Sequence, residues 1–163
     1  MSDSHIRELM EAFCLAYASG ESGRIESFLH DDVVWTISGP IDVISYCGTH
    51  RGKAAVVDLT KRVLPSLFSG FVLNRESMVV EGDRVAILNR FTARRRTDDR
   101  PISYRLAQFI RIRDNKIIEY LSLLDSFDAA EQMLGHPLDV GDEHGADPAD
   151  LPIISDAGGL VAI

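Results

Sequence analysis

The sequence predicts an α+β fold, with three helices before a meander of antiparallel strands and one short helix after it. Apolar residues recur at helical spacing in residues 4–18 and 52–67, and with a period of two from residue 71 to residue 124. Short turn sequences separate the later segments, so each strand pairs with the next. A chain of 163 residues with 45% hydrophobic content suits one domain with one sizeable core.

The N-terminal half holds the three expected helices and a first strand. Residues 4–18 form the first helix, with Phe13 and Tyr17 on its apolar stripe and Ser4 or Asp3 available as its cap. A short second helix follows around residues 25–29, and a short strand covers residues 33–38. An irregular loop then runs from residue 39 to residue 50. The third helix covers residues 52–67, and Pro65 bends or ends it.

Four strands follow, over residues 71–80, 84–96, 102–113 and 116–124, and a short helix closes the domain. Even positions of the third of these strands, such as Tyr104, are mostly apolar and are expected to face the core. Gln108 breaks that face, and Ser122 does so more mildly in the last strand. Both side chains either bond within a plain core or line a ligand pocket, and the sequence leaves both readings open.

The last two strands are apolar on both faces, since Phe109, Leu121 and Leu123 alternate with residues of the core face. Such a sheet is expected to be covered by helices on one side and by another subunit on the other. The sequence therefore predicts a homodimer formed through the outer face of the sheet.

Composition limits the partners. The net charge of −8 argues against nucleic acid, and no apolar run reaches the length of a membrane helix. The run Arg94-Arg95-Arg96 is expected to be a solvated hairpin end. The N-terminus is charged and amphipathic rather than signal-like, so cytoplasmic residence is expected. Two cysteines do not make a disulfide framework, and the histidines lack ligand spacing, so we expect no metal and no cofactor.

A second region, residues 136–163, is expected to form an acidic C-terminal tail after the domain of residues 1–135. It carries six acidic residues and no lysine or arginine. We expect it to pack along the domain or across a partner subunit through its apolar end, whose members are Leu151, Ile153, Ile154, Leu160, Val161 and Ile163.

The order of these elements, over residues 4 to about 134, resembles the nuclear transport factor 2-like superfamily, and within it the SnoaL-like, ketosteroid-isomerase-like group. The segments that carry the resemblance are FLHDDVVWTISGP, HRGKAAVVDL and QFIRIRDNKIIEYLSLLD. The resemblance implies a cone-shaped domain, in which a strongly curved sheet wraps around helices and encloses an apolar pocket. It also implies dimerisation through the sheet.

The resemblance does not carry the known catalytic residues with it. In SnoaL-type cyclases an acidic residue of the last strand matches Ser122, and a histidine of the preceding strand matches Gln108. The base of the ketosteroid isomerases matches Thr36 or Ile37. Their tyrosine matches Phe13, and their protonated aspartic acid also matches Gln108.

Limonene-epoxide-hydrolase relatives use two aspartates and an arginine. Arg90 matches the arginine, but Thr92 and Ser122 stand where the aspartates belong. Asp125, which follows the last strand, is expected to cap the closing helix rather than to act as a catalytic acid.

The candidate pocket therefore offers hydrogen-bond donors without an obvious base at neutral pH. Its expected members are Phe13, Tyr17, Trp35, His50, Arg90, Thr92, Tyr104, Gln108, Tyr120 and Ser122. Arg90 is either a rim arginine or an anion ligand, and His50 either a surface residue or a base on a covering loop. We expect a protein that binds a small apolar molecule, non-catalytic or of unknown activity. The alternative is an isomerase, cyclase or hydrolase acting on a carbonyl or polyketide-like compound.

Overall fold

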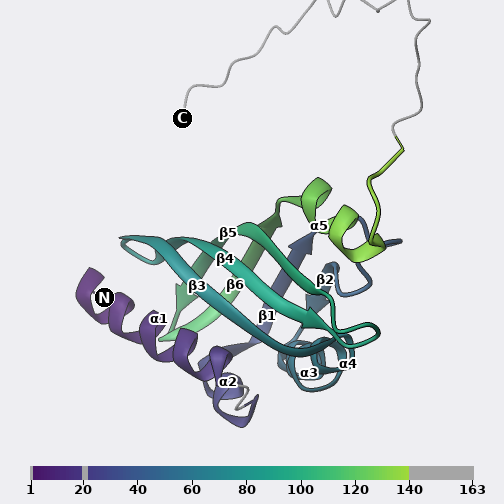
Figure 1. The fold of residues 1–163 in the computed structure, drawn as a ribbon. Coiled ribbons are helices and arrows are strands. Elements are labelled where there is room, and N and C mark those ends of the chain that lie inside the picture. The colour runs from purple at the N-terminus through teal and green to yellow at the C-terminus, as the bar shows by residue number, and fades with distance from the viewer. Residues whose placement is uncertain (1, 20–21, 140–163) are drawn as a thin grey trace, which may run out of the picture.

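The computed structural model describes residues 2–19 and 22–139, and it confirms the α+β architecture (Figure 1). Helices cover one face of a curved sheet of six strands in the order β2-β1-β6-β5-β4-β3. The helices are α1 (Asp3–Ala18), α2 (Ser22–Phe28), α3 (Lys53–Asp58), α4 (Leu64–Leu67) and α5 (Ser126–Leu134), with a π-helical turn, η1 (Leu59–Val63), between α3 and α4. The strands are β1 (Leu29–Ser38), β2 (Gly48–Arg51), β3 (Phe68–Glu81), β4 (Arg84–Arg95), β5 (Pro101–Arg113) and β6 (Lys116–Leu124).

Helix α1 packs its apolar stripe onto the sheet, with Ile6 and Met10 fully buried. Its cap is Ser2, whose side chain accepts a hydrogen bond from the backbone N–H of His5, and not Ser4 or Asp3 as the sequence suggested. The helix begins one residue earlier than predicted, so the cap moves outward with it.

The third predicted helix is interrupted by the π-helical turn η1. Pro65 has no N–H to donate to the preceding turn, and the N–H of Leu64 bonds to the carbonyl of Leu59, five residues back. Pro65 therefore perturbs this helix, as its position in the sequence predicts.

Strand β2 corrects the prediction of an irregular loop up to His50. It pairs antiparallel with β1, which itself lies parallel to β6. Four residues with no alternation of apolar and polar side chains give no strand signal, so pairing with β1 decides the conformation of this segment.

The register between β4 and β5 decides which residues face the core. Tyr104 lies opposite Phe91, and Leu106 lies opposite Asn89, so even positions of β5 share a face with odd positions of β4. Arg90 and Thr92 therefore lie on the outer face, and the prediction that they line the pocket is wrong. Arg90 forms an ion pair with Glu76 there, with 3.4 Å between nitrogen and oxygen.

Arg95 of the β4–β5 hairpin is less solvated than predicted, whereas Arg94 and Arg96 are exposed as expected. Arg95 donates to the carbonyl of Met133 near the end of α5 and to the carboxylate of Asp98. Arg96 donates to the carbonyls of Pro65 and Phe68 around the end of α4. These guanidinium groups tie two helix ends to the sheet.

Asp125 occupies the N-cap position of α5, but its side chain makes no capping hydrogen bond. Its backbone carbonyl instead accepts the N–H of Ala129, while the side chain is exposed. The predicted position is confirmed, and the predicted side-chain bond is wrong. The predictions for residues 140–163 of the tail lie outside the described residues. No helix among the described residues is long and apolar enough to cross a membrane.

Candidate functional site

A small cavity of about 40 Å³ lies between the sheet and the segment that follows β1. Its walls are aromatic and aliphatic, with polar atoms from tyrosines, Gln108 and Ser122. The lining residues are Tyr17, Trp35, Ile37, Tyr46, Leu64, Leu73, Phe91, Tyr104, Leu106, Gln108, Tyr120, Ser122 and Leu124. Among these described residues there is no carboxylate, histidine, lysine or arginine. We call this space the inner cavity.

Stacked aromatic rings form one wall of the inner cavity. The Trp35 indole stacks on Tyr120 with ring centroids 3.5 Å apart and planes within 6°, and Tyr17 stacks on it at 6.2 Å. Trp35 is fully buried, and its Nε1 has no hydrogen-bond partner in the part of the chain that the structure describes. A buried N–H without a partner costs free energy. The apolar stacking of the indole in this wall offsets that cost.

A chain of buried side-chain hydrogen bonds crosses the inner face of the sheet. The Asn89 amide donates to Gln108 Oε1 at 2.8 Å, and Gln108 Nε2 donates to the Tyr120 hydroxyl oxygen. Asn89 and Gln108 are only 3% and 5% exposed. Gln108 therefore forms hydrogen bonds within the core and also lines the cavity. The two alternatives that the sequence left open for this side chain are both true.

A second polar pair lies among the other walls of the inner cavity. The hydroxyls of Tyr46, from the segment between β1 and β2, and Tyr104, from β5, share a short hydrogen bond. Burial raises the pKa of both phenols, and it also raises the pKa of Tyr17 and Tyr120 well above the ordinary value. All four hydroxyls are therefore neutral at pH 7 and remain hydrogen-bond donors.

A larger cleft of about 430 Å³ lies beside helix α1, between that helix and the inner face of the sheet. Four of its lining residues, Tyr17, Leu73, Gln108 and Tyr120, also line the inner cavity. These side chains form a shared wall, so the two spaces are neighbouring compartments. We call the larger one the α1 cleft.

Charged and sulfur-bearing side chains also line the α1 cleft. Arg75 of β3 lies 3.6 Å from Glu11 of α1, and both side chains are partly exposed. Cys14 lines the cleft as well, and burial raises the pKa of its thiol, so it is a poor nucleophile at neutral pH. The cleft thus combines an apolar floor with one ion pair.

Seven of the ten predicted pocket residues line one or both of these spaces. Phe13 lines the α1 cleft; the inner cavity holds Tyr17, Trp35, Tyr104, Gln108, Tyr120 and Ser122. His50 lies in β2, where its ring bonds to the carbonyl of Tyr46, and it lines neither space. The prediction that His50 lines the pocket is therefore wrong, and the reading as a base on a covering loop fails with it, since the edge strand β2 holds His50 beside β1.

The residues of the site that the sequence reasoning missed include Tyr46, Leu73, Arg75 and Asn89. A signal for Asn89 exists, because it is the polar member of the alternation Val85, Ile87, Asn89, Phe91, Ala93. That odd-numbered set is more apolar than the even-numbered set, which holds Arg90 and Thr92. Tyr46 gives no such signal, since it comes from a segment without periodicity.

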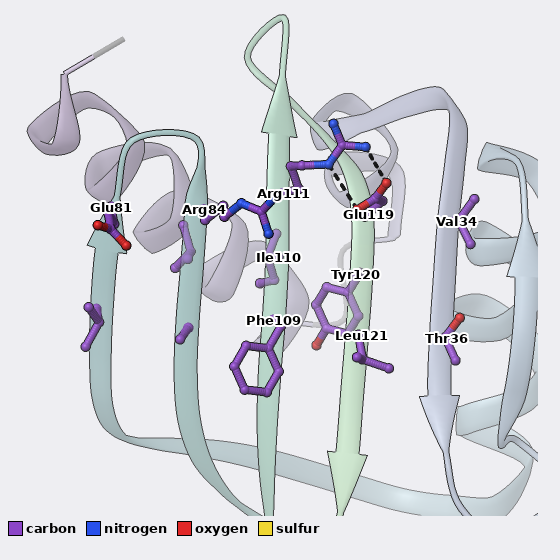
Figure 2. A pocket seen from close by; sticks show the side chains of 13 residues that line it. Val34, Thr36, Glu81, Arg84, Phe109, Ile110, Arg111, Glu119, Tyr120 and Leu121 are labelled. Atoms are coloured by element: carbon purple, nitrogen blue, oxygen red, sulfur yellow. Dashed lines mark hydrogen bonds and ion pairs between the residues drawn. The ribbon is translucent and has the colours of Figure 1, made fainter. Parts of the chain in front are cut away.

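A third hollow, of about 470 Å³, lies on the sheet face that the helices leave uncovered (Figure 2). The side chains of Phe109 and Leu121 lie on this uncovered face, whereas those of Ile110 and Tyr120 lie on the opposite, buried face (Figure 2). Phe109 is 49% and Leu121 is 37% exposed. An ion pair between Arg111 and Glu119 borders this patch, so it has an apolar centre and a charged edge.

Similar solved structures share the fold. A proposed isomerase from Rhodopseudomonas palustris is 27% identical, with a TM-score of 0.69, and the match covers 83% of this chain and 100% of that one. TerC, co-crystallised with polyporic acid, is 20% identical at a TM-score of 0.71, with 82% of this chain and 99% of that one covered. An epoxide hydrolase of M. tuberculosis, similar to limonene epoxide hydrolase, is 17% identical at 0.67, with 81% and 91% covered.

No protein of curated function matches the chain. The model of the SnoaL-like domain family, by contrast, matches residues 10–120, which is most of the described fold from α1 to β6. The NTF2-like and ketosteroid-isomerase-like structures that share the fold agree with this match. This chain therefore belongs to the SnoaL-like domain family of the NTF2-like superfamily.

Proposed function

We propose that this protein binds a small, largely apolar molecule in the α1 cleft and the inner cavity, and that it does not transform this molecule. One observation carries the proposal: the described lining of the inner cavity contains no group that accepts or releases a proton near neutral pH. The tyrosine hydroxyls there are held neutral by burial. General acid–base chemistry requires a group whose pKa lies near the working pH, and this lining supplies none.

The volumes favour the α1 cleft as the place for the body of the ligand. Small-molecule sites usually measure about 300–1,000 Å³. The cleft, at about 430 Å³, falls in this range, whereas the inner cavity of about 40 Å³ has room for only a few water-sized groups. A ligand in the cleft reaches the inner cavity with one substituent, past the shared wall of Tyr17, Leu73, Gln108 and Tyr120.

Glu11 is the one carboxylate in the described lining of the α1 cleft. Its side chain is 48% exposed and lies beside the Arg75 guanidinium. Its position suits recognition at the rim better than proton transfer at the floor.

The proposal is tested with acetophenone, a small neutral aromatic ketone, as the probe. Trp35 is the single tryptophan of the chain, so its indole N–H gives one resonance in a ¹⁵N–¹H NMR spectrum. Because Trp35 stacks on Tyr120 at the shared wall, we expect this resonance to shift and saturate as acetophenone is added. An indole resonance that stays in place up to the solubility of the probe contradicts the proposal.

A matched pair of variants controls for binding elsewhere on the protein. Leu73→Phe adds a ring at the shared wall of the two spaces, and it should weaken acetophenone binding by at least about tenfold, since overpacked sites tolerate added volume poorly. Val72→Phe adds a ring on the next residue of the same strand, where the side chain is 52% exposed, and should leave binding unchanged. Equal effects of the two variants would place the probe outside the cleft.

A second candidate function is an isomerase that acts on a carbonyl compound. The likeness to the proposed isomerase of Rhodopseudomonas palustris, which covers that whole chain, favours it. An enzyme that enolises ketones exchanges the methyl protons of acetophenone for deuterium in D₂O, and proton NMR follows this loss of signal. We expect no acceleration over buffer alone. Exchange that the protein accelerates, and that the Leu73→Phe variant loses, would establish the enzymatic alternative.

We also propose that two copies of the chain associate through the patch of Figure 2. Its apolar centre, with Phe109 and Leu121 partly exposed, supports this, because monomeric proteins rarely leave such a sheet face bare. Sedimentation equilibrium should give a dimer at micromolar concentration, and Leu121→Glu should give a monomer. A wild-type monomer contradicts the idea. Cytoplasmic residence stays a prediction, which a fluorescent fusion in the native host would test.

A further inference from the structure

The chain of hydrogen bonds from Asn89 to Tyr120 has a direction. Asn89 donates to the oxygen of Gln108, which leaves the Gln108 nitrogen to donate to the Tyr120 hydroxyl oxygen. The Tyr120 oxygen therefore acts as an acceptor in this chain, and its own proton is left over. Within residues 2–19 and 22–139 that proton has no acceptor.

The place of Tyr120 makes this proton available to a ligand. The side chain lines both the α1 cleft and the inner cavity. Stacking on Trp35 fixes the plane of the ring, and an edge contact with Phe13, with ring centroids 6.4 Å apart, packs against it as well. The hydroxyl is thus a donor of fixed position at the boundary between the two compartments.

Resting on the proposed function, we infer that the ligand carries a carbonyl-type oxygen that accepts the Tyr120 hydroxyl proton. An acceptor is required because the hydroxyl already receives a hydrogen bond from Gln108 and has one donor function to satisfy. The lining of the inner cavity carries no described cation, so a neutral oxygen fits better there than a carboxylate. Ketones, quinones and aromatic aldehydes belong to this class.

The Asn89–Gln108 pair acts as a positioning element for this donor. A hydroxyl that accepts a hydrogen bond donates a stronger one, because consecutive hydrogen bonds polarise one another. In the free protein a water molecule can take the proton, and the ligand oxygen then replaces it with little change in the number of hydrogen bonds. The specificity lies in rejecting molecules that lack the oxygen, because those leave a buried donor without a partner.

The test compares two probes of the same shape. Acetophenone carries a carbonyl, and α-methylstyrene carries a CH₂ group in the place of that oxygen. Titration of the Trp35 indole resonance should give wild-type protein a preference for acetophenone of about tenfold, which corresponds to ~1.4 kcal/mol. Tyr120→Phe should remove this preference by weakening acetophenone binding while leaving α-methylstyrene binding unchanged or tighter.

The matched control is Tyr104→Phe, which removes a different buried hydroxyl from the same cavity. The Tyr104 hydroxyl shares a hydrogen bond with Tyr46 in which either oxygen can be the donor, so this variant shows which hydroxyl supplies the proton, and we expect it to keep the preference for acetophenone. A second readout needs no variant: the infrared C=O stretch of ¹³C-labelled acetophenone should move to lower frequency on binding than in hexane.

The outcomes separate the inference from the proposed function. If neither probe shifts the indole resonance, both are refuted. If both probes bind equally well, or if Tyr120→Phe weakens both to the same degree, the cleft binds apolar molecules but the inference about Tyr120 is wrong. A bound carbonyl that absorbs at its hexane frequency also overturns the inference. Loss of the preference in Tyr104→Phe alone would move the donor role to Tyr104.

Discussion

Replacing Gln108 by leucine tests whether the buried polar chain is a working part of the fold. The substitution keeps a side chain of similar size in β5 but removes both of its hydrogen bonds. Asn89, at 3% exposure, then loses its acceptor, and the Tyr120 hydroxyl loses its donor. Neither group has another described partner.

The expected loss of stability follows from these two groups. A buried polar group left without a partner costs about 1–3 kcal/mol. The neighbouring inner cavity, at about 40 Å³, admits a water molecule that offsets part of this. We therefore expect Gln108→Leu to lower the free energy of unfolding by about 2–3 kcal/mol, and the melting temperature by about 4–12 °C at the usual sensitivity of a domain of this size.

Urea unfolding followed by circular dichroism measures this change, in a double-mutant cycle with Asn89→Leu. Because the double variant removes both partners of one bond, it should be less destabilised than the sum of the single variants by about 1–2 kcal/mol. Thr92→Val on the outer face is the control and should change stability by less than about 0.5 kcal/mol. The reasoning fails if Gln108→Leu matches this control, or if the two losses simply add.

Three further predictions concern the local structure. Asp125→Ala should change stability by at most about 0.5 kcal/mol, because the side chain makes no capping bond. A loss above about 1 kcal/mol would show that the side chain does cap the helix. Gly39→Ala should destabilise the fold, since the new Cβ would lie 2.6 Å from Cys47 Sγ, and the double variant with Cys47→Ala should recover stability; no recovery would place the strain elsewhere. Hydrogen bonding to a neighbouring arginine lowers the pKa of Asp98 to about 2, so wild type should exceed Asp98→Asn in stability above about pH 4 and lose that advantage as the pH falls towards about 2. A difference that does not depend on pH would contradict the assignment.

The sheet was predictable because its strands carry a clear period of two and its turns carry turn residues. Asp114 and Asn115, expected to form the tight turn between the last two strands, both have positive φ, as that turn requires. The prediction that even positions of β5 face the core was correct, because Tyr104, Leu106 and Ile110 dominate that face. The prediction that even positions of β4 face the core was wrong. Both faces of this strand carry apolar residues, and only the pairing with β5 decides which face is buried.

The candidate site was predictable only where it lies on regular elements. Trp35, Gln108 and Tyr120 were found because strand alternation fixes the face of each residue. Tyr46 comes from a segment without periodicity, and its place is decided by its contact with Tyr104 across 58 residues of chain. The position of His50 could not be predicted either, because the pairing of β2 with β1 is a tertiary contact without a local sequence pattern.

A crystal structure of the protein with acetophenone tests most directly whether the α1 cleft is the ligand site. We expect density for the ring between helix α1 and Leu73, with the carbonyl oxygen within hydrogen-bond distance of the Tyr120 hydroxyl. The ketone should be unchanged in that density. Density on the outer face near Phe109, or a cleft that stays empty at saturating acetophenone, would contradict the proposed binding function.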